Sequence, residues 1–136
     1  EQEIEVVKST TQDKPVDLKV ILDAEEIIYF QGLIRRIPVP DNVYKYAVTL
    51  AAKTRPGTPS AHPLANDFVT WGAGPRASQY LIIGAKCHAA IHGKYSPDIE
   101  DVKAIATSIL RHRIVRNYKA EAEGFTIDKI IQEFLK

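Results

Sequence analysis

Apolar residues recur three and four positions apart along most of the chain, which is the spacing of one face of an α-helix. The first clear stripe consists of Ile27, Phe30, Ile34 and Ile37. Asp23 and Glu26 precede it at capping-box spacing, so the pattern predicts a helix that begins near Asp23. Pro38 and Pro40 then end that helix, because proline cannot continue the helical hydrogen-bond ladder.

The same periodicity predicts further helices. They begin at Asp41, Pro75, Asp98 and Thr126, and the first ten residues form one or two more helical turns. The inner side of the helix at Asp41 consists of Val43, Ala47, Leu50 and Thr54. The helix from Pro75 to Gly93 is apolar on most faces, through Ala77, Leu81, Ile82, Ile83, Ala85, Cys87, Ala89, Ala90 and Ile91. Such a helix is expected in the centre of a bundle, since a surface helix keeps a polar side.

Residues 56–74 are rich in Pro, Ser, Asn and Asp and have no helical period, so they are predicted to be a loop. A loop of this length is uncommon inside a compact domain and is more often functional. An alternating strand pattern is absent except around Pro38 to Pro40, and there is no internal repeat. The chain is therefore predicted to be all-α, a small bundle of about four to six helices.

The composition excludes several classes of protein. With 136 residues, 45% hydrophobic and 26% charged, the chain is expected to be one globular domain, neither disordered nor spanning a membrane. A single cysteine, Cys87, rules out an internal disulfide and fits a cytoplasmic protein. The net charge of +1 gives no argument for nucleic acid as a partner. The absence of methionine suggests that the sequence begins inside a longer protein or follows processing.

Two stretches look at first like parts of a nucleotide-binding core. Gly93-Lys94 is the only Gly-Lys pair, but it lacks the earlier glycine and the following hydroxyl residue of a P-loop. Asp23 follows an apolar run as a Walker B acid does, yet a helix N-cap preceded by an apolar residue explains it better.

Histidine and cysteine residues lie close together near Gly93. His88 and His92 have the spacing of a two-histidine metal site, but their helix supplies no acidic ligand. Hydrogen-bonded structural histidines, and no metal, are therefore predicted. Cys87 lies in the most apolar helix and is predicted to be a small buried residue rather than a nucleophile with His112.

The segment 71–78, WGAGPRAS, contains the strongest candidate for chemistry. Pro75 suits the first helical position, with Gly74 as N-cap, so Arg76 falls in the first turn of the helix. A cation there opposes the helix macrodipole at a cost of about a few tenths of a kcal/mol. An external anion would offset that cost, and the planar guanidinium and the free N–H groups of the turn both suit phosphate. The alternative is a solvated arginine beside a sharp turn.

The segment 72–78, GAGPRAS, resembles the sensor 2 motif of MoxR-type AAA+ ATPases, which usually reads GASPRA. Other segments resemble the same family in the same order: LDAEEI (22–27), the helix that ends in KTR (46–55), AKCHA with GKY (85–95), EDVK (100–103) and LRHRI (110–114). The resemblance covers about residues 22 to 118. The sequence departs from the family at Gly74, which replaces a serine N-cap, and at Ile99, which replaces a proline.

This resemblance implies a lid domain at residues 22–136, preceded at 1–21 by a helical segment and linker from the junction with an AAA+ core of the same chain. It implies that Arg76 contacts the γ-phosphate of ATP and stabilises the transferring phosphoryl group, with Gly74, Pro75 and Ala77 shaping the binding site. ATP with Mg²⁺ is then the cofactor of the full-length protein. None is expected on this fragment, which lacks a P-loop and should not hydrolyse ATP alone.

The family also implies partners. Its members are associated with hexameric rings that act as chaperones, often on metal-dependent or von Willebrand A-domain proteins. We expect Trp71 and residues 33–39 to pack against the adenine or the core, and we expect no contact with nucleic acid or membrane.

Two alternatives carry no nucleotide role. A helical DNA-binding module would use the cationic cluster Arg111, Arg113, Arg116 and Lys119. Glu121 and Glu123 follow that cluster directly, and the net charge is near neutral, which argues against it. The other alternative is an adaptor bundle that binds only protein.

Overall fold

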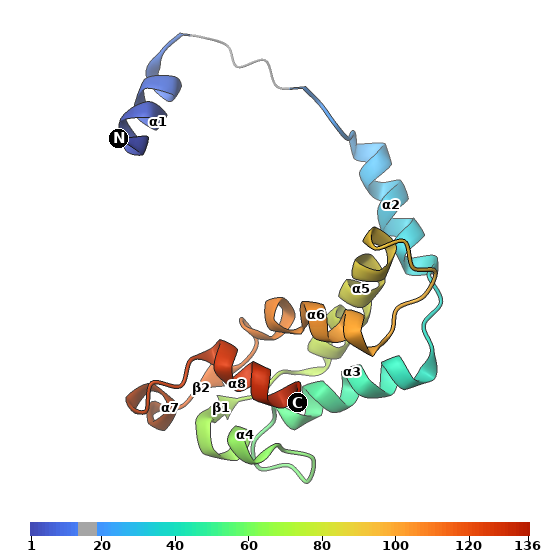
Figure 1. The fold of residues 1–136 in the computed structure, drawn as a ribbon, viewed down its shortest axis with the longest axis vertical. Coiled ribbons are helices and arrows are strands. Elements are labelled where there is room, and N and C mark those ends of the chain that lie inside the picture. Colours follow the sequence, from blue (N-terminus) through green and yellow to red (C-terminus); the bar gives the residue numbers. More distant parts are fainter. Residues whose placement is uncertain (14–18) are drawn as a thin grey trace.

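The computed structural model describes residues 1–13 and 19–136, and over these residues it contains eight helices and two short strands (Figure 1). The helices are α1 (Gln2–Thr11), α2 (Ala24–Arg36), α3 (Asp41–Lys53), α4 (Pro63–Phe68), α5 (Pro75–Ile91), α6 (Ile99–Leu110), α7 (Tyr118–Ala122) and α8 (Ile127–Phe134). The strands are β1 (Val69–Trp71) and β2 (Val115–Arg116). The predicted all-α bundle is confirmed, although short helices raise the count above the predicted number.

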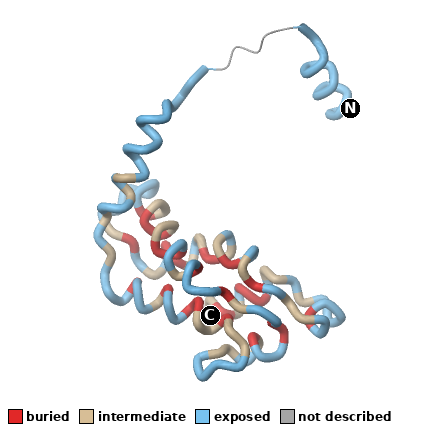
Figure 2. The backbone as a smooth tube through the Cα atoms, turned by 180° about the vertical axis from the view of Figure 1, so that it is seen from behind, coloured by how far each residue is buried: buried red, intermediate tan, exposed pale blue. Residues whose placement is uncertain are grey.

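One hydrophobic core holds the domain together, and α3, α5, α6 and α8 supply most of it. Its largest fully buried apolar side chains are Val43, Leu50, Leu81, Val102, Leu110, Ile130, Ile131 and Phe134. Figure 2 shows that the buried residues gather in this part of the chain, whereas α1 is exposed along its length. Every helix among the described residues is too short or too polar to span a lipid bilayer.

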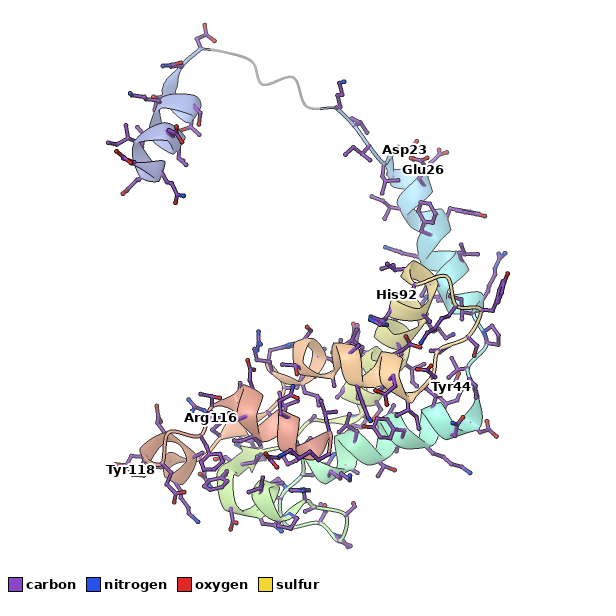
Figure 3. All side chains as sticks on the ribbon, in the orientation of Figure 1. Asp23, Glu26, Tyr44, His92, Arg116 and Tyr118 are labelled. Carbon is purple, nitrogen blue, oxygen red and sulfur yellow. The ribbon has the colours of Figure 1, made fainter. Side chains whose placement is uncertain are left out.

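The predicted helix starts agree with the structure. Asp23 and Glu26 form a complete capping box on α2, and both are labelled in Figure 3. Asp98 forms a second capping box at α6, and the Thr126 side chain accepts a hydrogen bond from a backbone amide at the start of α8. Gly93 follows the end of α5 with φ of 72°, a left-handed conformation that glycine adopts without strain.

The prediction of an irregular loop over residues 56–74 is wrong in its second half. Pro63 starts α4 there, because the His62 ring accepts a hydrogen bond from the Leu64 amide and caps the helix. The strand β1 follows and pairs antiparallel with β2, Val69 opposite Arg116. With six residues in α4 and three in β1, both are too short to show a hydrophobic period. The stretch Pro38 to Pro40 forms no strand.

Two apolar helices are less buried than their sequences predict. In α5, Ile91 is 82% exposed and Ala90 is also exposed, because the last turn packs on one side only, through the fully buried Ala89. The stripe on α2 has the predicted spacing, yet Ile27 and Phe30 each remain 46% exposed. Hydrophobic periodicity therefore located α2 and α5 correctly, but it overestimated how much of their surface the bundle covers.

A buried carboxylate joins the end of α5 to the start of α6. Asp101 is fully buried and accepts hydrogen bonds from the Asp98 amide at 2.8 Å, from Lys94 Nζ at 3.0 Å and from His88 Nδ1 at 2.7 Å. Burial raises the pKa of Asp101, but the Asp98 amide, His88 and Lys94 together outweigh burial and lower the pKa to about 2. The carboxylate is thus charged whenever the domain is folded near neutral pH.

Replacing Asp101 with Asn should lower the free energy of unfolding at neutral pH by about 2–3 kcal/mol, the equivalent of a pKa lowered from 3.8 to about 2. Because the folded pKa is the lower one, this stability is present above about pH 4 and is lost as the pH falls towards 2. Urea unfolding between pH 7 and pH 2 measures it. Asp41→Asn, which changes an exposed carboxylate, serves as control. This variant should still lose stability as the pH falls, as the wild-type protein does, whereas Asp101→Asn should not.

Candidate functional site

Arg76 lies in the first turn of α5, as predicted. Gly74 is the N-cap in an extended conformation (φ −79°, ψ −177°), and Pro75 occupies the first helical position. Arg76 is exposed, and its side chain makes no hydrogen bond or ion pair with the described residues. Its guanidinium is therefore available to a group outside this chain segment.

The segment that leads into α5 is fixed to the end of α3. The amide of Ala73 donates a hydrogen bond to the Thr54 hydroxyl at 2.8 Å, and Arg55 Nε donates to the Ala73 carbonyl at 2.8 Å. The Thr54 hydroxyl donates in turn to the carbonyl of Ala51 at 2.7 Å. Because Thr54 and Ala73 are fully buried, these bonds are shielded from water and fix where α5, and hence Arg76, begins.

Gly72 is required at this contact for a steric reason. A Cβ atom at Gly72 would lie 2.3 Å from the Thr54 carbonyl oxygen and 2.6 Å from Arg55 Cα. Both are backbone atoms, so a side chain could not be accommodated without moving α3 or the segment itself. A Cβ at Gly74, by contrast, would meet nothing within 4 Å.

Arg76 shares a surface groove of about 760 Å³ with a second arginine. The groove is lined by Arg35, Tyr44, Val48, Arg76, Ser78, Gln79, Tyr80, Ile82 and Ile83. Figure 3 labels Tyr44 on α3. The Arg35 side chain, like that of Arg76, has no partner among the described residues. Two unpaired guanidinium groups beside tyrosine rings suit an anion with a planar group attached.

Arg35 was not singled out from the sequence, although it lies within residues 33–39, which were expected to pack against the adenine or the core. Its position in the last turn of α2, where cations complement the helix dipole, gives it a local structural role as well. Only the tertiary structure brings it near α5, through the largely buried Lys86, whose ammonium donates to the Arg35 carbonyl at 2.9 Å.

Backbone amides contribute less to this site than the sequence suggested. Pro75 has no N–H, and the Ala77 amide already donates to the Gly74 carbonyl at 2.9 Å. The amide of Arg76 is the free donor of the turn. Ala77 itself is fully buried, so its side chain belongs to the core. Attraction for an anion therefore rests mainly on the guanidinium groups.

The remaining candidate residues lie elsewhere. Trp71 is 70% exposed on β1 and does not line the groove of Arg76. Cys87, expected to be buried, is only half-buried, because it lines a second groove with Leu22, Ile27 and Phe30 beside α2. Among residues 1–13 and 19–136, no group of three or more His, Cys, Asp or Glu side chains is arranged to hold a metal ion.

The cationic cluster near β2 serves contacts within the domain. Arg111 pairs with Asp128 at 2.6 Å, and Arg113 donates to the Ile109 carbonyl at 2.7 Å. Arg116, labelled in Figure 3, donates to the Phe125 carbonyl at 2.6 Å, and Lys119 lies over the Phe68 ring. These contacts give each cation a structural role within the domain, which argues against the DNA-binding alternative.

The family model of the AAA lid domain matches residues 62–134, more than half of the chain. The chain belongs to the AAA lid domain family. The matched residues run from α4 to α8 and include the start of α5 with Arg76.

Known proteins similar to this lid domain are longer than it is. It is 25% identical to "Uncharacterized protein YeaC" of Bacillus subtilis, covering 98% of this chain and 39% of that protein. It is 27% identical to "Chaperone MoxR1" of Mycobacterium tuberculosis, covering 90% of this chain and 32% of that protein. A crystal structure of a "putative ATPase" from Cytophaga hutchinsonii superposes with a TM-score of 0.79 at 27% identity, over 98% of this chain and 41% of that one. The resemblance to MoxR-type AAA+ ATPases is thereby confirmed.

Replacing Gly72 with Ala should destabilise the lid domain by at least about 2 kcal/mol, because the added methyl group collides with backbone rather than with a movable side chain. Gly74→Ala is the matched control, two residues away in open space, and should cost less than about 1 kcal/mol. Thermal or urea unfolding measures both. Equal stability of the two variants would contradict the close approach of Gly72 to α3.

Proposed function

We propose that this domain is the nucleotide-sensing lid of a MoxR-type AAA+ ATPase, in which Arg76 contacts the γ-phosphate of ATP. The observation that supports this role is an exposed guanidinium without a partner among the described residues, at the start of a helix whose origin is fixed by buried hydrogen bonds. Because the backbone that carries Arg76 is fixed, contact with a phosphate would order only its side chain.

The side chains around Arg76 fit a nucleotide. Arg76 and Arg35 provide planar donors for phosphate oxygens, and Tyr44 and Tyr80 line the same groove with aromatic surface. ATP supplies the phosphoryl group, and the role of these arginines is to bind and to balance the charge on its oxygens. Because no acidic cluster of three or more ligands lies in the described residues, Mg²⁺ would be held by the AAA+ core rather than by the lid.

A phosphate contact at Arg76 can also act on the whole lid. The helix α5 that carries Arg76 contributes Leu81, Ala85 and Ala89 to the core, where it packs against α3 and α6. A force on the first turn of α5 is therefore transmitted to the bundle as a rigid unit. We infer that ATP and ADP favour different lid positions because only ATP offers the terminal phosphate.

The rest of the proposal concerns the longer protein. It places this lid beside an AAA+ core in the same chain, in a homo-oligomeric ring that the family suggests is hexameric. Coupling ATP hydrolysis to remodelling of a partner protein, such as one with a von Willebrand A domain, follows the chaperone role that the name of MoxR1 states for that protein. A soluble cytoplasmic location is part of the same proposal.

Replacing Arg76 with Ala in the ATPase that carries this lid should lower ATP turnover on the order of 100-fold, because one donor to the transferring phosphoryl group is lost. Arg76→Lys should recover only part of the rate, since an ammonium keeps the charge but not the planar pair of donors. Steady-state ATP hydrolysis and nucleotide binding measure both effects.

Lys129→Ala is the matched control, because Lys129 is an exposed cation on α8 outside the groove of Arg76. Its turnover should equal that of the wild-type protein. Wild-type kinetics in Arg76→Ala, with the circular dichroism spectrum unchanged, would remove the sensor role and leave the protein-binding adaptor as the explanation.

A further inference from the structure

Two histidines lie one turn apart at the end of α5, away from Arg76 at its start. The rings of His88 and His92 lie side by side, with centroids 4.1 Å apart and planes tilted by 30°. Figure 3 labels His92, the C-cap of α5. His92 is exposed, and the His88 side chain is 29% exposed, so solvent reaches both rings.

The hydrogen bonds of both rings fix which nitrogen carries the proton. His88 Nδ1 lies 2.7 Å from a carboxylate oxygen of Asp101, and His92 Nδ1 lies 2.7 Å from the backbone carbonyl oxygen of His88. A carboxylate and a carbonyl oxygen only accept hydrogen bonds, so each Nδ1 is the donor. In the neutral rings, the lone pair is therefore on Nε2 of both histidines.

Each histidine thus has the hydrogen bond that metal-binding histidines usually make. Metal-ligating imidazoles almost always donate their second N–H to a carboxylate or a backbone carbonyl, which orients the ring and raises its basicity. Asp101 can act as such an acceptor because Lys94 Nζ and the Asp98 amide hold its carboxylate in place. The hydrogen bonds that explain the histidines as structural residues thus leave both Nε2 atoms unprotonated, and the exposed His92 ring would turn to share an ion with His88.

The charge around the two rings favours a cation. The side chains of Asp98 and Asp101 carry two negative charges, and among the described residues the ammonium that bonds to them is that of Lys94. One net negative charge therefore remains beside His88. A divalent cation close to the rings would be attracted by this charge, which is only partly screened because Asp101 is buried.

We propose that His88 and His92 bind one divalent transition-metal ion through their two Nε2 atoms. Imidazole nitrogen suits Zn²⁺, Ni²⁺ and Cu²⁺, and Cu²⁺ should bind most tightly, as the general order of stability for these ions requires. Since the described residues offer no third ligand, water completes the coordination. The site is independent of the nucleotide role proposed for Arg76.

Calorimetric titration of the untagged full chain with Zn²⁺, and separately with Cu²⁺, tests the site. We expect one ion per chain and a dissociation constant at least about tenfold higher in His88→Ala and in His92→Ala, since each loses one of two ligands. His112→Ala is the matched control, because His112 is an exposed histidine in the turn after α6, and it should bind as the wild-type chain does. The electron paramagnetic resonance spectrum of bound Cu²⁺ should show coupling to two nitrogens.

His92→Ala keeps the test decisive if His88→Ala fails to fold. His92 is exposed, and its removal leaves the bond between His88 and Asp101 intact. Equal Zn²⁺ affinity in wild-type, His92→Ala and His112→Ala chains would overturn the proposal, as would a Cu²⁺ spectrum with a single nitrogen coupling.

Discussion

The close approach of residues 72–73 to the end of α3 is the constraint on which the candidate site depends. Gly72 lies against backbone atoms of Thr54 and Arg55, and both the amide and the carbonyl of Ala73 are bonded to side chains of these two residues. Buried polar groups are costly without partners, so this arrangement is stable only when all of its bonds form together. The position of α5 follows from it, and the position of Arg76 follows from α5.

The helix α5 connects the proposed sites. Its middle turns are buried in the core through Leu81 and Ala85, and its two ends remain accessible. At the first turn Arg76 has no compensating charge within the described residues, whereas at the last turn His88 is bonded to a buried carboxylate. A rigid helix with a cation at one end and paired imidazoles at the other keeps each group in a fixed position relative to the core.

The sequence predicted features that depend on neighbours in the chain and missed those that depend on tertiary contacts. Capping residues such as Asp23 and Asp98, and the position of Arg76 after Gly74-Pro75, follow local rules and were correct. The helix α4 and the pairing of β1 with β2 were missed, because a six-residue helix and strands of two or three residues carry too few apolar positions for a period. Arg35 was expected only as one of residues 33–39, because its place in the groove depends on the packing of α2 on α5, which no local pattern encodes.

The apolar surface of α2 adjoins the groove of Arg76. No residue of α2 is buried, and its apolar side chains Ile27 and Phe30 line a groove that also includes Arg35 and Ile83. Arg35 and Ile83 line the groove of Arg76 as well, so the two grooves adjoin. An apolar surface beside two guanidinium groups matches a molecule with a planar base and a charged phosphate chain. The half-exposed apolar stripe of α2 is thus consistent with a surface that the bundle leaves open for a nucleotide and for the AAA+ core that binds the nucleotide. This supports the nucleotide-sensing role.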